Sequence, residues 1–195
     1  MSKLHWNPAS LLAPVPAVLV SCGTLETPNV ITIAWTGILC STPPKTYISV
    51  RPERFSHNII RETGEFVLNL PPASLVHAVD YCGVKSGRDG DKFKLSGLTP
   101  ESCEGVAAPA VAECPLSIPC RVTEVVHLGS HDMFIADILG VEVDEHVIDK
   151  SGRLDIAKCD LMAYAHGTYF ELGKRLATFG FSVRKKPVKR ASRKK

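Results

Sequence analysis

The sequence predicts a mainly β protein, in which short antiparallel strands form a closed barrel and a few helices are inserted between them. Three observations support this. The apolar segments are short, and some alternate with a period of two residues, as strands with one buried face do. Fourteen glycines and 14 prolines among 195 residues supply frequent turns. Helical segments do not follow the strands one for one, as they would in a doubly wound parallel sheet.

Two strands are predicted near the start of the chain. Residues 16–22 are apolar and β-branched, and a turn over residues 23–28 leads into a strand over residues 29–35. In this second strand a small, partly polar face alternates with a bulky one, formed by Val30, Thr32 and Ala34 against Ile31, Ile33 and Trp35. We expect one face to pack in the core and the other to be free to meet a ligand or a partner.

A strand over residues 46–51 and a helix over Phe55–Thr63 are predicted next. We expect Ser56 to be the N-cap of the helix and Gly64 to end it in the left-handed conformation. A helix start also suits a phosphate, because free backbone N–H groups lie there beside the Ser56 hydroxyl. Both roles of Ser56 stay open at this point.

The middle of the chain contains a predicted strand, Glu65–Leu70, and a predicted helix over residues 73–82. Residues 83–97 then form a polar loop with four glycines and four basic residues, Lys85, Arg88, Lys92 and Lys94. Such a loop can reach over an anionic ligand, or it can be an ordinary mobile surface loop.

The clearest pattern is a hairpin over residues 116–143, with a two-residue turn at Gly129-Ser130. This turn places His131 at the start of the second strand of the hairpin. Residues 144–158 are a predicted loop, and two short segments follow over residues 159–166 and 168–172.

The charge of the chain divides it into two parts. Residues 184–195 carry eight Lys or Arg and no acid, which leaves 15 basic and 20 acidic side chains in the rest. We therefore predict one domain over residues 1–183 and a disordered basic extension over residues 184–195. The extension is interpreted as a solvated tail or as an arm for nucleic acid.

Several classes of function are disfavoured. The N-terminal residues form neither a signal peptide nor a membrane span, so we expect a cytoplasmic protein without a membrane partner. Seven cysteines without a CxxC pair indicate reduced thiols, and no Cys/His spacing predicts a metal site. The motifs GxGxxG, GxxxxGK[ST], HExxH and GxSxG are absent from the sequence.

Residues 29–44, NVITIAWTGILCSTPP, replace the apolar pattern of a core strand with small and hydroxyl residues around one tryptophan. Small residues let a flat ligand approach the backbone, and the indole ring can pack on it. Flavin mononucleotide (FMN) needs ring faces, polar edges and phosphate partners. The candidates for the ring faces are Trp35 and Tyr164. Those for the polar edges are Asn29, Thr32 and Thr36, and those for the phosphate are Arg51, Ser56 and Lys92.

Seven motifs in order make the chain, over residues 7–184, resemble the flavin reductase-like family with the FMN-binding split barrel, and most closely its flavoredoxin branch. The motifs are PVPAVLVSCG, NVITIAWTGILCSTPP, SVRPERFSHNII, GEFVLNLP, DKFKLSGLTP, GSHDMFIADILGVEVDE and YFELGKRLATFGFS. The resemblance implies a six-stranded antiparallel Greek-key barrel with flanking helices, a homodimer, and FMN near the dimer interface. Its implied FMN-binding residues are Asn29, Thr32, Ala34, Trp35, Thr36, Arg51, Ser56, His57, Lys92, His131 and Tyr164, with Arg54 as a further candidate.

The resemblance implies an FMN flavoprotein of the oxidoreductase class that carries electrons, as a flavoredoxin does. No catalytic side chain is expected, because the flavin itself accepts and donates the electrons. One alternative is an NAD(P)H:flavin oxidoreductase that supplies reduced flavin to a partner enzyme. A second is binding of nucleic acid or another partner through the basic extension. We rank nucleic acid last, because it leaves residues 29–44 unexplained.

Overall fold

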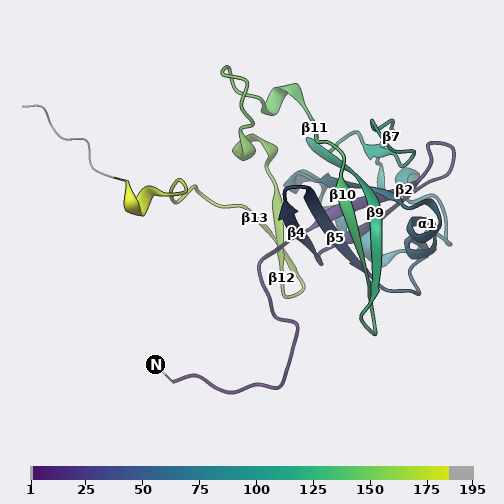
Figure 1. The fold of residues 1–195 in the computed structure, drawn as a ribbon, viewed down its shortest axis with the longest axis horizontal. Coiled ribbons are helices and arrows are strands. Elements are labelled where there is room, and N and C mark those ends of the chain that lie inside the picture. Colours follow the sequence, from purple (N-terminus) through teal and green to yellow (C-terminus); the bar gives the residue numbers. More distant parts are fainter. Residues whose placement is uncertain (1, 185–195) are drawn as a thin grey trace, which may run out of the picture.

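The structure, a computed structural model, describes residues 2–184 (Figure 1). Residues 185–195, which make up nearly all of the predicted basic extension, lie outside the described residues. The interpretation of that extension therefore stays a prediction. The core of the described chain is an antiparallel barrel with helices packed on it, which confirms the mainly β fold class.

The main sheet has eight strands, in the order β3-β2-β6-β9-β10-β5-β4, with β11 paired to β9. All pairs in this sheet are antiparallel. Its strands are β2 (Val18–Gly23), β3 (Pro28–Ile33), β4 (Thr36–Ser41), β5 (Pro44–Val50), β6 (Glu65–Leu70), β9 (Leu116–His127), β10 (Asp132–Ile138) and β11 (Glu142–Val143). Two small sheets join β1 (Val15–Pro16), β12 (Met162–Ala165) and β13 (Thr168–Glu171), and β7 (Pro100–Glu101) with β8 (Ala110–Val111).

The strand count corrects the expected six. The predicted strand over residues 29–35 ends at Ile33, and Thr36–Ser41 forms a further strand, β4, which pairs with β5. Ala34 and Trp35 connect β3 to β4, which lie at opposite ends of the sheet order. The barrel is thus split where these two residues cross between its edge strands, and both residues line a hollow there.

Two apolar layers explain why β2 and β3 are apolar on both faces. Ile31 and Ile33 face the barrel core, whose largest side chains include Phe66 and Phe134. Val30 faces the other way and packs in a second cluster with the helices. Strands buried on both faces are expected to carry near-continuous apolar residues. The small face of β3 is therefore mostly core, and Thr32 donates a hydrogen bond to the Val79 carbonyl.

The helices are α1 (Phe55–Thr63), α2 (Val76–Val84), which follows the 3₁₀ turn η1 (Ala73–Leu75), and α3 (Lys92–Ser96). Short 3₁₀ turns occur at η2 (Glu145–Val147), η3 (Ile156–Cys159) and η4 (Phe181–Val183). Gly64 ends α1 with φ of 70°, as predicted. The predicted N-cap is wrong: Arg54 occupies that position, and Ser56 lies inside the first turn.

The segment expected to be a loop, residues 83–97, contains α3. Asp91 accepts a hydrogen bond from the Lys94 N–H, and Gly97 ends the helix in the left-handed conformation. These are ordinary helix start and stop signals. The predicted hairpin is confirmed: β9 pairs with β10, and the Leu128 N–H donates to the His131 carbonyl at 2.9 Å across Gly129-Ser130.

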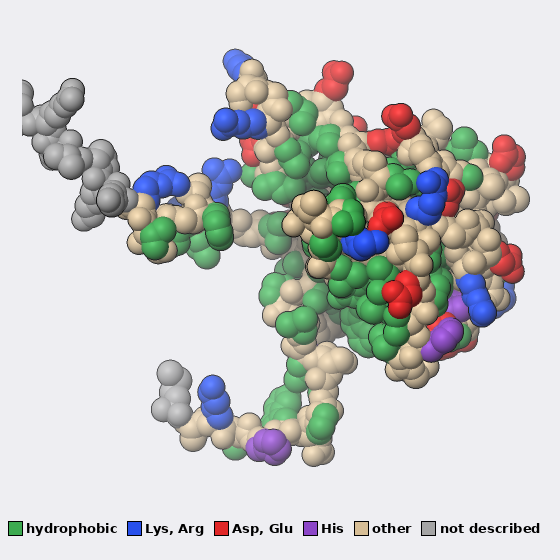
Figure 2. All heavy atoms as spheres, viewed as in Figure 1, with side chains coloured by type: hydrophobic (Ala, Val, Ile, Leu, Met, Phe, Trp, Pro, Cys, Tyr) green, Lys and Arg blue, Asp and Glu red, His purple; other side chains and the backbone are tan. Residues whose placement is uncertain are grey.

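Two segments run away from the barrel in Figures 1 and 2, before β1 and after β13. We call residues 2–12 the N-terminal arm and residues 173–184 the C-terminal arm. Both carry exposed apolar side chains, including Leu4, Leu12, Leu176 and Phe179. Within residues 2–184, we find no helix long and apolar enough to cross a membrane, and no group of three or more His, Cys, Asp or Glu that could hold a metal.

Candidate functional site

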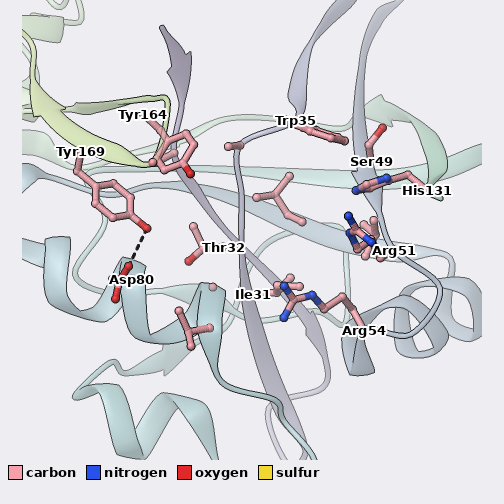
Figure 3. A pocket seen from close by; sticks show the side chains of 17 residues that line it. Ile31, Thr32, Trp35, Ser49, Arg51, Arg54, Asp80, His131, Tyr164 and Tyr169 are labelled. Carbon is pink, nitrogen blue, oxygen red and sulfur yellow. Dashed lines mark hydrogen bonds between the residues drawn. The ribbon is translucent and has the colours of Figure 1, made fainter. Parts of the chain in front are cut away.

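Two adjoining hollows lie beside the split in the barrel. The first, which we call the aromatic hollow, has a volume of about 360 Å³ and contains Trp35, His131, Tyr164 and Tyr169 in its wall (Figure 3). The second, which we call the basic hollow, has a volume of about 450 Å³. Its cations are Arg51, Arg54, Lys85, Arg88 and Lys92. Ile31, Arg51 and Arg54 line both hollows, so that one elongated ligand can extend from one into the other.

Aromatic rings form two opposite sides of the aromatic hollow. Trp35, on the β3–β4 connection, lies against His131, with 4.5 Å between the ring centroids and 39° between the planes. Tyr164 and Tyr169, on β12 and β13, pack edge to face at 5.4 Å on the other side (Figure 3). Trp35 is 45% exposed, although it is large and apolar. An aromatic face open to a hollow is a typical surface for a flat ligand.

The polar groups of the aromatic hollow are held by hydrogen bonds and burial. The Tyr169 hydroxyl donates to Asp80 Oδ1 at 3.3 Å, and burial together with this carboxylate raises the pKa of Tyr169 to about 12. Burial, assisted by nearby Arg51, lowers the pKa of His131. The lowered pKa keeps the His131 imidazole neutral further into the acid range than an exposed histidine.

Positive charge dominates the basic hollow. Glu53 is the one carboxylate among its lining residues, and it forms an exposed ion pair with Arg51 at 3.5 Å. Arg88 lies 5.5 Å above the Phe55 ring and donates to the Glu53 carbonyl at 3.1 Å. Five cations against one carboxylate make a site for an anion with several oxygens.

Lys92 is the most buried cation of the basic hollow, with 3% of its surface exposed. Its Nζ donates to the carbonyl oxygens of Cys82 and Lys85, at 3.0 and 3.2 Å, where α2 ends. An ammonium group has three N–H donors, so one remains for a ligand. Burial lowers the pKa of Lys92. An anion bound at Nζ would favour the charged ammonium again.

Ser56 reaches the basic hollow with its hydroxyl oriented by Asn29. Asn29 Nδ2 donates to Ser56 Oγ at 2.7 Å, and the same amide lies 3.5 Å from Cys22 Sγ. Because Ser56 Oγ accepts this bond, its own proton is free to point to another acceptor. Burial raises the pKa of Cys22 to about 11, so that this neighbour stays a neutral thiol.

The structure thus brings together most of the residues singled out in the sequence. Those that line the hollows are Thr32, Ala34, Trp35, Arg51, Ser56, Lys92, His131 and Tyr164, together with Arg54. Asn29 lies outside both linings, behind Ser56, to which its side-chain amide donates a hydrogen bond. Thr36 and His57 lie outside both linings: Thr36 donates to the Tyr47 carbonyl, and His57 is buried against Asp132.

Other lining residues were not singled out as site residues. Lys85 and Arg88 belong to the glycine-rich basic segment for which an anion-binding role was considered. Ser49, Asp80 and Tyr169 carry no local signal, because the fold alone brings the end of β5, the middle of α2 and β13 to one hollow.

Comparisons with known proteins agree with this geometry. Residues 11–173 match the family model of the flavin reductase like domain. The flavoredoxin of Desulfovibrio vulgaris (Miyazaki F) superposes with a TM-score of 0.87 at 33% identity, covering 94% of this chain and all of that one. An uncharacterized protein of Archaeoglobus fulgidus is 31% identical over 84% of this chain and 91% of its own length.

A more distant relative carries a functional name. It is the reductase component of a 4-nitrophenol 4-monooxygenase/4-nitrocatechol 2-monooxygenase of Rhodococcus opacus, 27% identical over 55% of each chain. The family model spans most of the described chain, and the flavoredoxin shares its fold along almost the whole length. The chain therefore belongs to the flavin reductase-like domain family, in its flavoredoxin branch, and its fold is the FMN-binding split barrel of that family.

Proposed function

We propose that this protein binds FMN across the two hollows and uses it to carry electrons. The observation that carries the proposal is the adjacency of an open aromatic hollow and a hollow with five cations, joined through Ile31, Arg51 and Arg54. FMN has the matching shape and charge: a flat ring system connected by a short polyol to a phosphate dianion. The residues present therefore fit this cofactor.

Each group of side chains has a distinct task in this proposal. Trp35 and Tyr164 offer aromatic surface to the ring system. Thr32 and Ala34, which have small side chains, line the hollow beside the ring. Ser56, Lys92 and the arginines of the basic hollow hold the phosphate through charge-assisted hydrogen bonds, which are stronger than neutral ones. Bound FMN supplies the redox chemistry, and the protein binds, orients and shields it.

The electron-carrying role is supported by the similarity to flavoredoxin, which extends along nearly the whole chain. A second candidate role is reduction of flavin by NADH or NADPH for a partner oxygenase. The relative named as the reductase component of a monooxygenase favours it. The two roles differ in whether a nicotinamide reduces the bound flavin rapidly.

FMN binding is tested by titrating apoprotein with FMN and with riboflavin, which lacks the phosphate, and following flavin fluorescence. We expect FMN to bind at least tenfold more tightly, because even one hydrogen bond to a charged group contributes about 1.5–3 kcal/mol. Failure to bind FMN, or equal affinity for the two flavins, would contradict the proposal.

The two electron-transfer roles are separated by mixing the FMN complex with NADH and with NADPH in a stopped-flow instrument under anaerobic conditions. A carrier is expected to be reduced slowly by both nucleotides and rapidly by a reduced redox protein. Rapid reduction by a nicotinamide, with many turnovers in the presence of excess flavin, would identify a reductase instead.

We also propose that the protein is a homodimer whose second copy covers the arms and the rim of the aromatic hollow. Both arms emerge beside this hollow: Leu11 and Leu12 line a smaller hollow together with Trp35 and Tyr164, and the C-terminal arm continues from β13. The exposed apolar side chains of the arms need a partner surface. The basic extension over residues 184–195 and the acidic balance of residues 1–183 favour a second copy as that partner.

A further inference from the structure

Asp132 is a buried carboxylate that lies between two histidines and outside the lining of both hollows. Its Oδ2 is 2.8 Å from His57 Nε2, and its Oδ1 is 2.8 Å from His127 Nδ1. Asp132 and His57 are buried, with 5% and 2% of their surfaces exposed, whereas the His127 side chain is 70% exposed. The three side chains thus form a bridge with a buried half, His57–Asp132, and a half that faces solvent, Asp132–His127.

The buried half joins the two elements that carry the site. His57 follows Ser56 in the first turn of α1, three residues after the N-cap Arg54, and both Ser56 and Arg54 line the basic hollow. Asp132 follows His131, whose ring lies in the aromatic hollow against Trp35. A single hydrogen bond between side chains 75 residues apart therefore connects the start of α1 to the start of β10.

The surroundings of the pair leave it little freedom. The His57 ring packs edge to face on Phe134, at 5.2 Å and 73°. His57 Nδ1 lies 3.3 Å from Asn58 Oδ1. On the other side, β10 is fixed by pairing with β5, where Asp132 is opposite Val50, the residue before Arg51. A buried carboxylate held in this way is costly to leave without its partner.

We propose that the His57–Asp132 pair is a positioning device, which holds the basic hollow at the distance and orientation from the aromatic hollow that a phosphorylated flavin spanning both requires. The pair touches neither part of the ligand. It acts through its chain neighbours, Ser56 on one side and His131 on the other. This inference rests on the proposed binding of FMN and adds the residues that make the site select the phosphorylated form.

A purely stabilising pair and a positioning pair predict different results. Loss of a stabilising contact lowers the melting temperature and leaves the preference for FMN over riboflavin unchanged. Loss of a positioning contact lowers this preference, because the phosphate no longer meets its partners while the ring is bound in its hollow. The ratio of the two dissociation constants is therefore the informative readout.

The test measures the dissociation constants of FMN and riboflavin for the full-length protein and for Asp132→Asn and His57→Leu, with melting temperatures by circular dichroism. We expect both variants to bind FMN at least tenfold more weakly, while riboflavin affinity changes by less than about threefold. Asp137→Asn is the matched control: it is the same substitution on the same strand, and its partner Lys45 lies outside both linings.

Two further variants keep the test decisive. His127→Ala removes the exposed half of the bridge and is expected to keep the FMN preference within about threefold. His57→Gln retains an amide donor toward Asp132 and is expected to keep more of the FMN preference than His57→Leu. This comparison tests the inference even if Asp132→Asn does not fold. An unchanged ratio in Asp132→Asn or His57→Leu overturns the inference, whereas a wild-type protein without FMN preference overturns the proposed function instead.

Discussion

At the scale of single residues, the site depends on a few side chains whose chemistry is set by burial. Lys92 is a cation in a nearly closed environment, stabilised by the two carbonyl oxygens at the end of α2. Ser56 has its hydroxyl oriented by Asn29. Both arrangements place N–H or O–H donors in the basic hollow before a ligand arrives, so that little side-chain entropy remains to be lost on binding.

Replacing Lys92 with methionine should weaken FMN binding by about 10- to 100-fold, since one charge-assisted hydrogen bond contributes about 1.5–3 kcal/mol. Methionine keeps the apolar stem and removes the ammonium. Riboflavin affinity should stay close to that of the wild type, and fluorescence titration checks both. Lys94→Met is the control, because Lys94 is exposed on the same helix outside both linings. Equal losses in the two variants would disprove the role of Lys92.

Replacing Trp35 with alanine should weaken binding of FMN and riboflavin alike, by about 2- to 10-fold, because aromatic contacts contribute about 0.5–1.5 kcal/mol. The effect differs from that of Lys92 because the ring system, common to both flavins, loses its partner. Trp35→Phe restores an aromatic face and should recover part of the affinity. Isothermal titration of the three proteins measures this, and a loss confined to FMN would contradict the placement of the ring.

At the scale of elements, close contacts between α1, β3 and the segment after α2 shape the basic hollow. Gly87 lies where this segment crosses over Asn29 and Phe55. A Cβ atom there would come within 2.3 Å of Asn29 Oδ1 and 2.4 Å of Phe55 Cδ1. The glycine thus permits the approach that brings Arg88 over the Phe55 ring and into the lining of the basic hollow.

Gly87→Ala should push the 85–88 segment outward and reduce FMN affinity by at least tenfold, because Lys85 and Arg88 move away from the hollow and Asn29 is disturbed behind Ser56. Gly140→Ala is the matched control: its Cβ would meet no atom closer than the Pro119 Cγ at 3.9 Å. Fluorescence titration of both variants checks the prediction. It fails if Gly87→Ala binds FMN like the control.

Two elements, β4 and α3, were not predicted from the sequence. The strand β4 was missed because Thr36–Ser41 mixes small, polar and exposed apolar residues at the end of the sheet, where no second apolar layer imposes an alternating pattern. Helix α3 was missed because its five residues are too few to show a helical period. By contrast, α1 and the hairpin of β9 and β10 follow strong local signals, a C-terminal glycine and a two-residue turn, and were predicted correctly.

At the scale of the whole molecule, the two arms carry apolar side chains that the rest of the described chain leaves exposed. Leu176 and Phe179 are fully exposed on the C-terminal arm. Burying such a side chain contributes about 1.5–3 kcal/mol, so several of them together can hold a second copy. The same contact would cover the rim of the aromatic hollow and remove the flavin ring from solvent.

The double variant Leu176→Ser, Phe179→Ser should therefore shift the protein from dimer to monomer. Light scattering coupled to size exclusion should give about twice the chain mass of 21.2 kDa for the wild type and a single chain mass for the variant. Leu128→Ser, at an exposed leucine on the β9–β10 turn, is the control and should stay dimeric. A wild-type monomer would contradict the dimer proposal. It would not bear on the proposed FMN site, which the FMN and riboflavin titrations test separately.

The sequence by itself determined the fold class and most of the strands, and it predicted the chemical classes of the site, because these depend on local periodicity, turn residues and side-chain type. Only the tertiary structure decided which of those side chains meet. Lys92 and Ser56 reach one hollow because α1 and α3 pack against β3, while His57, next to Ser56 in sequence, turns inward to Asp132. Asp80 and Tyr169 join the aromatic hollow for the same reason: their proximity comes from packing between segments far apart in the chain, which no local pattern records.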